Sequence, residues 1–124
     1  MTDQEIFDQV WDWFIVKGNP RALEQDPSSI VAACRYRTRD GRKCAFGVLI
    51  PDDKYTPKME GLPGYEVIAE FLPEFRPNRD LIIALQTAHD GKGQANLERE
   101  FRGIAQEFGL RVPGEGEEEN VRVD

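Results

Sequence analysis

The amino-terminal segment has the amphipathic pattern of a helix. Thr2 and Glu5 stand at the spacing of a capping box, in which a hydroxyl and a carboxylate each accept a hydrogen bond from a backbone amide. Apolar residues then recur on one helical face, at Ile6, Phe7, Val10, Trp11 and Phe14. Gly18 and Pro20 predict that the helix ends near Lys17, because glycine permits a left-handed stop and proline cannot continue a helix.

The pattern changes in the central segment, residues 34–50. Residues 34–38 alternate between charged and less polar side chains, as a half-buried strand does. The Asp40-Gly41 pair is typical of tight hairpin turns, since both residue types tolerate positive φ. The apolar run at residues 44–50 predicts the returning strand, buried on both faces. This segment is therefore predicted to be a β-hairpin.

The second half of the chain has the apolar period of helices. Residues 65–72, 79–89 and 94–108 each place apolar side chains on one helical face. Pro73 ends the first, Asn78 is a suitable N-cap for the second, and glycines follow the last two.

Residues 54–64 lack a regular pattern and contain several prolines and glycines, which predicts a long loop. Long loops inside compact domains are often functional. The loop therefore contributes three candidate binding residues, Tyr55, Met59 and Glu60.

Together these elements predict an α+β fold, with one central β-hairpin packed by about four helices in a single compact domain. A chain of 124 residues suits one domain. We expect residues 1–112 to be globular and residues 113–124 to be an acidic, mobile tail, because the tail is rich in glutamate and glycine. No stretch approaches the roughly 18 apolar residues of a membrane span, and the first residues lack the basic start of a secretory signal. A cytoplasmic location without a membrane partner is expected.

The net charge of −7 hides a basic region at the predicted hairpin. If residues 34–38 form a strand, Arg35, Arg37 and Arg39 project from one face, and each can hold a carboxylate or phosphate through two hydrogen bonds. Such a row fits an acidic protein surface, a phosphorylated small molecule or nucleic acid, although the overall acidity makes nucleic acid the weaker option. A solvated face without function is equally compatible with the pattern. The candidate binding residues of this region are Arg35, Arg37, Arg39, Arg42 and Lys43.

Four further residues carry reactive groups: Cys34, Cys44, His89 and Asp90. Thiolate and imidazole are zinc ligands, but the chain has no C-x-x-C pair, so neither a metal nor a cofactor is predicted. A Cys-His-Asp hydrolase would need all three groups in one cleft, whereas a histidine near a helix end is more simply explained by the helix dipole. No glycine-rich phosphate loop is present. Enzymatic activity stays open, and the residues favour a non-enzymatic role.

Several motifs, taken as a set, resemble small uncharacterised proteins of tailed phages and prophage regions. They are Cys34-x-Tyr36-Arg37, Gly41-x-Lys43-Cys44-Ala45-x-Gly47-x-Leu49-Ile50-Pro51-Asp52, Met59-Glu60-Gly61 and Leu85-Gln86-x-Ala88-His89-Asp90. The chain has Val48 where many of those proteins have a further cysteine, which weakens the metal hypothesis. The resemblance implies a context: small accessory phage proteins often bind a host component, including host defence machinery.

We therefore expect a non-enzymatic protein-binding accessory module, in its most specific form a phage-derived inhibitor of a host or defence protein, acting in the host cytoplasm. The expected partner is a host protein. The alternatives are a small hydrolase or nucleotide-handling enzyme and a binder of a phosphorylated small molecule.

Overall fold

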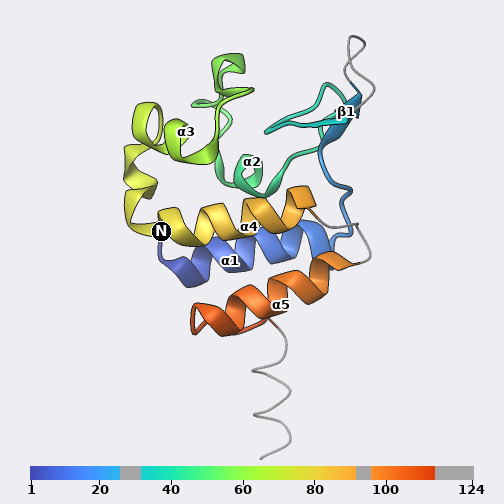
Figure 1. Cartoon of the computed structure of the whole chain (residues 1–124), viewed down its shortest axis with the longest axis vertical. Coiled ribbons are helices and arrows are strands. Elements are labelled where there is room, and N and C mark those ends of the chain that lie inside the picture. The colour runs from blue at the N-terminus through green and yellow to red at the C-terminus, as the bar shows by residue number, and fades with distance from the viewer. Residues whose placement is uncertain (26–31, 92–95, 114–124) are drawn as a thin grey trace, which may run out of the picture.

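The computed structural model describes residues 1–25, 32–91 and 96–113, and most of these residues are helical (Figure 1). The α-helices are α1 (Asp3–Trp11), α2 (Ala45–Leu49), α3 (Gly64–Glu70), α4 (Arg79–Gly91) and α5 (Leu97–Glu107). A π-helical segment, η1 (Asp12–Val16), extends α1, and two 3-10 segments are η2 (Pro57–Met59) and η3 (Pro73–Asn78). In the described ranges the strands are β1 (Leu23–Gln25) and β2 (Ala32–Cys34), paired antiparallel with Leu23 opposite Cys34.

The predicted α+β fold with a central β-hairpin is wrong, because the chain folds mainly as helices. The predicted returning strand at residues 44–50 is the helix α2. An isolated bridge between Arg37 and Lys43 is what remains of the hairpin ladder. The tight turn itself does form: Gly41 has φ +88°, and the Thr38 amide donates to the Arg42 carbonyl at 2.9 Å. The sequence signal for the turn was therefore sound, but the signal for the second strand was not.

Helix α2 holds an apolar run that is buried on all sides. Every residue from Ala45 to Leu49 is buried, and a short, fully buried run has no period that separates a strand from a helix. The Cys44 thiol caps the helix by accepting a hydrogen bond from the Gly47 amide at 3.2 Å. Gly47 also lies against the backbone of Tyr36, where an added Cβ would lie 2.0 Å from the Tyr36 carbonyl oxygen.

The amino-terminal helix confirms its prediction. Thr2 and Glu5 form the capping box, with the Glu5 amide donating to the Thr2 hydroxyl at 3.1 Å and the Thr2 amide donating to the Glu5 carboxylate at 2.8 Å. The helix continues through η1 and ends at Lys17, followed by Gly18 with φ +68°. The helices predicted in the second half also form, as α3, α4 and α5, within a few residues of their predicted ends.

The core packs η1, α4 and α5 against one another. Phe14 of η1 packs against His89 of α4 and Phe101 of α5, with ring centroids 5.5 Å and 6.1 Å apart. At the other end of α1, Asn78 donates to the Asp3 carboxylate at 2.7 Å. Figure 1 shows α2, α3 and the β1–β2 pair on the side of α4 that lies away from α5. Helix α4 therefore lies between the layer that contains α5 and the upper layer, which holds α2, α3 and the β1–β2 pair.

Two sequence expectations fall partly outside this description. The predicted acidic tail lies outside the described residues from position 114 onward, and the side chain of Cys34 is also outside them. Among the described helices, none is long and apolar enough to span a membrane.

Candidate functional site

The Glu60 carboxylate accepts hydrogen bonds from two separate segments of the chain. It accepts from the backbone amides of Tyr36 (3.0 Å) and Arg37 (3.1 Å) and from the Tyr55 hydroxyl (2.7 Å). Hydrogen bonds to a charged acceptor are stronger than neutral ones. Burial, together with the bond to Glu60, raises the pKa of Tyr55 to about 12. Glu60 therefore fastens the loop at residues 54–64 to the segment that follows β2.

Arg37 completes this arrangement. Its guanidinium donates to the Ile50 carbonyl at 2.8 Å, pairs with Asp52 at 2.8 Å and lies over the Tyr55 ring, 4.7 Å from its centroid. We call Glu60, Arg37, Tyr55 and Asp52 the loop clamp. Three predicted binding residues, Arg37, Tyr55 and Glu60, are thus brought together, and they bind one another.

The other predicted binding residues have varied surroundings. Met59 is completely buried in the core, whereas Arg39 is exposed at the turn. Arg42 pairs with Asp40 at 3.0 Å, and the Lys43 ammonium lies 5.1 Å from the centre of the Trp13 ring. A strand that would align the arginines in one row is not formed between residues 35 and 39, apart from the bridge at Arg37.

The Cys44 and His89 side chains are both buried and engaged. Burial raises the pKa of the Cys44 thiol to about 12, so the thiol does not become a nucleophilic thiolate near neutral pH. His89 is completely buried; its Nε2 accepts from the Ala22 amide at 3.2 Å, and its Nδ1 lies 2.7 Å from the Asp90 carboxylate. Since Nε2 accepts a hydrogen bond, Nδ1 carries the ring hydrogen and donates a hydrogen bond to the Asp90 carboxylate.

Gln86 connects these buried groups. Its side-chain oxygen accepts from the Phe46 amide at the start of α2 (3.0 Å), and its nitrogen donates to Asp90 at 3.0 Å. The same side chain lies beside the Cys44 thiol. The network therefore holds α2 and the segment before β1 against α4, so its role is structural. A general base needs a free ring nitrogen, and both nitrogens of His89 are occupied.

Among the side chains that the structure describes, no group of three or more His, Cys, Asp or Glu is arranged to hold a metal ion.

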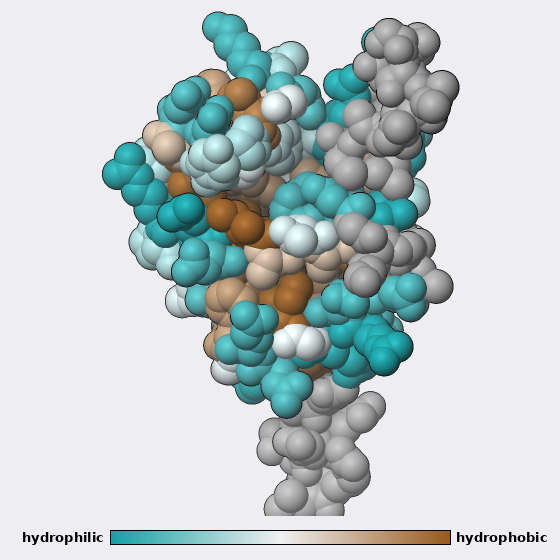
Figure 2. Space-filling model, viewed as in Figure 1, coloured by the Kyte–Doolittle hydropathy of each residue, from teal (hydrophilic) through white to brown (hydrophobic). Residues whose placement is uncertain are grey.

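A hollow of about 480 Å³ lies between α4 and the turn that leads into α3. We call it the central hollow. Its apolar lining comes from Leu62, Pro63, Tyr65, Ile82 and Ile83. Its polar lining includes Arg35, Gln86, Thr87 and Asp90. Figure 2 shows apolar surface gathered in the middle of this face, over α4 and beside the hollowed region above it.

A second hollow, of about 390 Å³, lies beside the first, between α3, η3 and the start of α4. We call it the arginine hollow, because Arg76 and Arg79 line it together with Tyr65, Ile68 and Ala69. The Tyr65 side chain is 51% exposed and lines both hollows.

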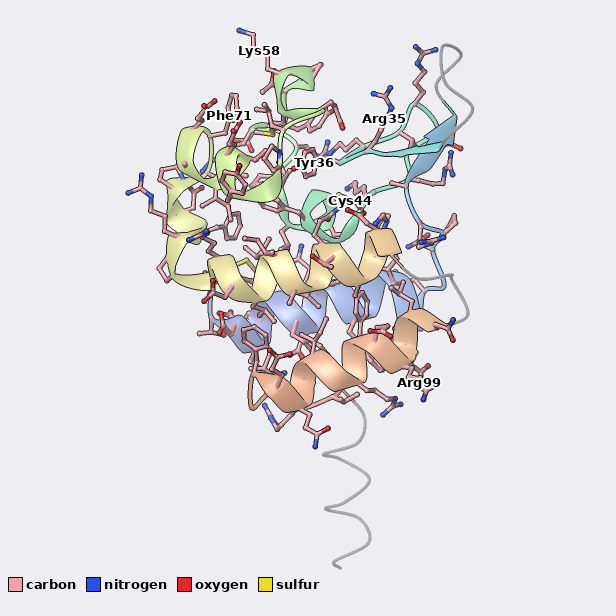
Figure 3. All side chains as sticks on the ribbon, in the orientation of Figure 1. Arg35, Tyr36, Cys44, Lys58, Phe71 and Arg99 are labelled. Atoms are coloured by element: carbon pink, nitrogen blue, oxygen red, sulfur yellow. The ribbon has the colours of Figure 1, made fainter. Side chains whose placement is uncertain are left out.

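The two hollows lie next to each other along α4 and share Tyr65, and we call the pair the α4 groove. Arg79, Ile82, Ile83, Gln86 and Asp90 follow one another at helical spacing, so they lie along one face of the helix. At 1.5 Å per residue, the distance from Arg79 to Asp90 is about 16 Å. Figure 3 shows Arg35 and Tyr36 on the upper side of α4 and Arg99 on the opposite side, at α5.

Two residues of this groove were already candidates from the sequence: Arg35 at one edge and Asp90 at one end. Tyr65, Ile83, Arg76 and Arg79 were not among those candidates. One signal was present: the buried face predicted for residues 79–89 holds Leu81, Ile82, Leu85 and Ala88, and it leaves Ile83 beside it as an apolar residue without a predicted partner.

Comparison of this chain with protein-family models, with curated proteins and with solved structures finds no match.

Proposed function

We propose that this chain is a non-enzymatic protein-binding module that holds a segment of a partner protein in the α4 groove. The observation that carries this proposal is the central hollow. Its lining combines apolar side chains with a few polar ones, as ligand sites do. Tyr65, half exposed between the two hollows, is the kind of aromatic side chain that is enriched at protein interfaces.

The shape of the groove favours a peptide segment over a compact small molecule. An extended peptide rises by about 3.3 Å per residue, so a groove of about 16 Å accommodates about five residues. The apolar side chains of the central hollow would bury an apolar side chain of the peptide, and its polar side chains would form hydrogen bonds that fix the register.

The side chains beside the groove that could take part in chemistry are engaged in a buried hydrogen-bond network, which favours binding over catalysis. Gln86 and Asp90 line the central hollow, but their side chains hold the buried network of Cys44 and His89 together. The resemblance to phage and prophage proteins supports a bacterial host protein, including a component of host defence, as the source of the bound segment.

The test is selection of binding peptides from a displayed random library against the immobilised full chain. We expect enriched peptides whose binding is lost when Thr87→Arg is introduced, because Thr87 is exposed in the central hollow and arginine would fill it. The matched control is Gln106→Arg, which adds the same side chain at an exposed position on α5 outside both hollows. Circular dichroism and urea unfolding check that both variants fold.

Peptides that bind both variants equally, or a selection that enriches nothing, would contradict the proposal. Capture from a bacterial lysate then identifies the partner. The protein of interest is one retained by the unchanged chain and by Gln106→Arg but not by Thr87→Arg.

A further inference from the structure

We infer that the bound segment is an extended peptide that places an apolar side chain in the central hollow and acidic side chains against Arg76 and Arg79. This inference rests on the proposed function and adds the chemistry of the partner. The two hollows share Tyr65. Leu62, Pro63, Ile82 and Ile83 offer apolar surface in the central hollow, and Arg76 and Arg79 place two cations in the arginine hollow.

The two arginines are available for an incoming carboxylate. Both are exposed, and in the described part of the chain neither forms an ion pair with a carboxylate. The acids of α3, Glu66 and Glu70, are not among the residues that line either hollow. Guanidinium groups bind carboxylates through paired hydrogen bonds, so two arginines side by side favour an acidic segment.

The spacing of the groove sets the spacing of the ligand. Arg79 lies three to four residues, or about 5 Å, before Ile82 and Ile83 along α4. An extended peptide covers that distance in one to two residues. The acidic residues are therefore expected within about two positions of the apolar anchor.

The net charge of −7 opposes an acidic ligand, but the distances decide which effect is larger. At physiological salt, exposed charges are screened beyond about 8 Å. A carboxylate in contact with Arg76 and Arg79 interacts most strongly with those two cations, because the Coulomb energy falls with distance.

The probes are four labelled eight-residue peptides with the same central Leu-Phe pair. The first carries two glutamates before the pair, the second carries two after it, and the third carries two on each side. The fourth carries two lysines on each side. Fluorescence anisotropy at physiological salt measures their affinity for the full chain. We expect at least one glutamate peptide to bind about tenfold more tightly than the lysine peptide, since two exposed ion pairs contribute at about that level.

Charge reversal tests the contact directly. Arg76→Glu with Arg79→Glu should abolish or invert the preference for glutamate peptides. Arg99→Glu with Arg111→Glu changes the net charge equally at exposed positions outside both hollows and should leave the preference intact.

The outcomes separate the two proposals. If the peptides bind in a manner blocked by Thr87→Arg but the glutamate and lysine peptides bind equally, the acidic preference is wrong and the binding groove stands. An acidic preference that survives reversal of Arg76 and Arg79 likewise overturns the inference alone. If the library selection and all four peptides give no binding, both proposals fail.

Discussion

Gly47 is the residue whose identity the fold constrains most directly. Its Cα lies against the Tyr36 backbone, and an added Cβ would lie 2.0 Å from the Tyr36 carbonyl oxygen, far inside van der Waals contact. A backbone atom cannot move aside as a flexible side chain can. Either α2 or the segment after β2 must then shift, and both are packed in the core.

The first prediction follows from this contact. Gly47→Ala should lower the free energy of unfolding by about 3 kcal/mol or more, at or beyond the upper end of ordinary overpacking. The matched control is Gly103→Ala on α5, where the Cβ meets nothing within 4 Å. That substitution should raise stability by about 0.5–1 kcal/mol, because alanine is the better helix former. Urea unfolding measures both, and a harmless Gly47→Ala would contradict the close approach.

The second prediction concerns the Cys44 thiol. Its side chain has no exposed surface, and burial raises its pKa to about 12, so it should resist alkylation in the folded protein. Treatment with iodoacetamide near pH 8, followed by mass spectrometry of peptides, should find Cys44 unmodified without denaturant and fully modified in about 6 M urea. Rapid modification of Cys44 in the folded state would mean that α2 opens readily.

At the scale of elements, the loop clamp shows how one carboxylate organises a loop. The residue 54–64 segment has only one 3-10 turn of its own, η2, so its position depends on contacts made elsewhere. Glu60 supplies them by accepting from two consecutive backbone amides and from the Tyr55 hydroxyl. The same loop leads into the Gly61–Gly64 turn that lines the central hollow, so the clamp also positions one wall of the α4 groove.

The third prediction tests the clamp. Glu60→Gln keeps the shape of the side chain but removes its charge, and it should cost about 2 kcal/mol, the range for hydrogen bonds to a charged group. The pKa of Tyr55 should fall part of the way from about 12 toward its ordinary value of 10.0, because burial remains while the charged acceptor is lost. Ultraviolet titration measures the tyrosine ionisation, and urea unfolding measures stability.

Asp52→Asn is the matched control for this prediction. Asp52 is 86% exposed, and its pair with Arg37 is screened by solvent, so the loss should be below about 1 kcal/mol. Equal losses in the two variants would contradict the central role of Glu60.

The elements also show which sequence signals sufficed. The capping box, the apolar face of α1 and the glycines after the helices act locally, and they predicted the helices well. The strand predicted at residues 44–50 was wrong because the conformation of this segment depends on its surroundings. A buried apolar run is compatible with a strand or a helix until its neighbours are known. Within this run, Gly47 leaves room for the Tyr36 backbone, and it does so in a helix.

At the scale of the whole molecule, the candidate groove could not be predicted because its walls come from distant parts of the chain. Arg35, Tyr65, Arg79 and Ile83 meet only after α4 packs beneath the upper layer. The predicted arginine row failed for a related reason. That prediction assumed that residues 35–39 form one strand. In the structure, Arg37 instead binds the Ile50 carbonyl and Asp52 as part of the loop clamp. Local patterns give helices and turns, and a surface site needs the tertiary arrangement.

The fourth prediction concerns alkaline stability, which depends on several buried acids at once. Burial raises the pKa of Cys44 from 9.0 to about 12 and that of Tyr55 from 10.0 to about 12, and it also raises the pKa of Tyr36. As the pH rises above about 9, the unfolded chain loses these protons before the folded one does. The unfolded state then binds fewer protons, so the free energy of unfolding must fall between about pH 9 and pH 12, by up to about 1.4 kcal/mol per pH unit for each group.

Urea unfolding under reducing conditions, at intervals from about pH 7 to pH 11, measures this decline. Cys44→Ala should delay its onset toward about pH 10, because the group with the lowest ordinary pKa has been removed, while Tyr36 and Tyr55 still contribute at higher pH. The folded state carries fewer ionised groups than the unfolded state in this range, so the decline reflects burial rather than the net charge of −7 alone. A stability that stays constant up to about pH 11 would show that Cys44 and Tyr55 ionise as easily in the folded protein as in the unfolded chain, and it would contradict the packing of α2 and of the loop clamp together.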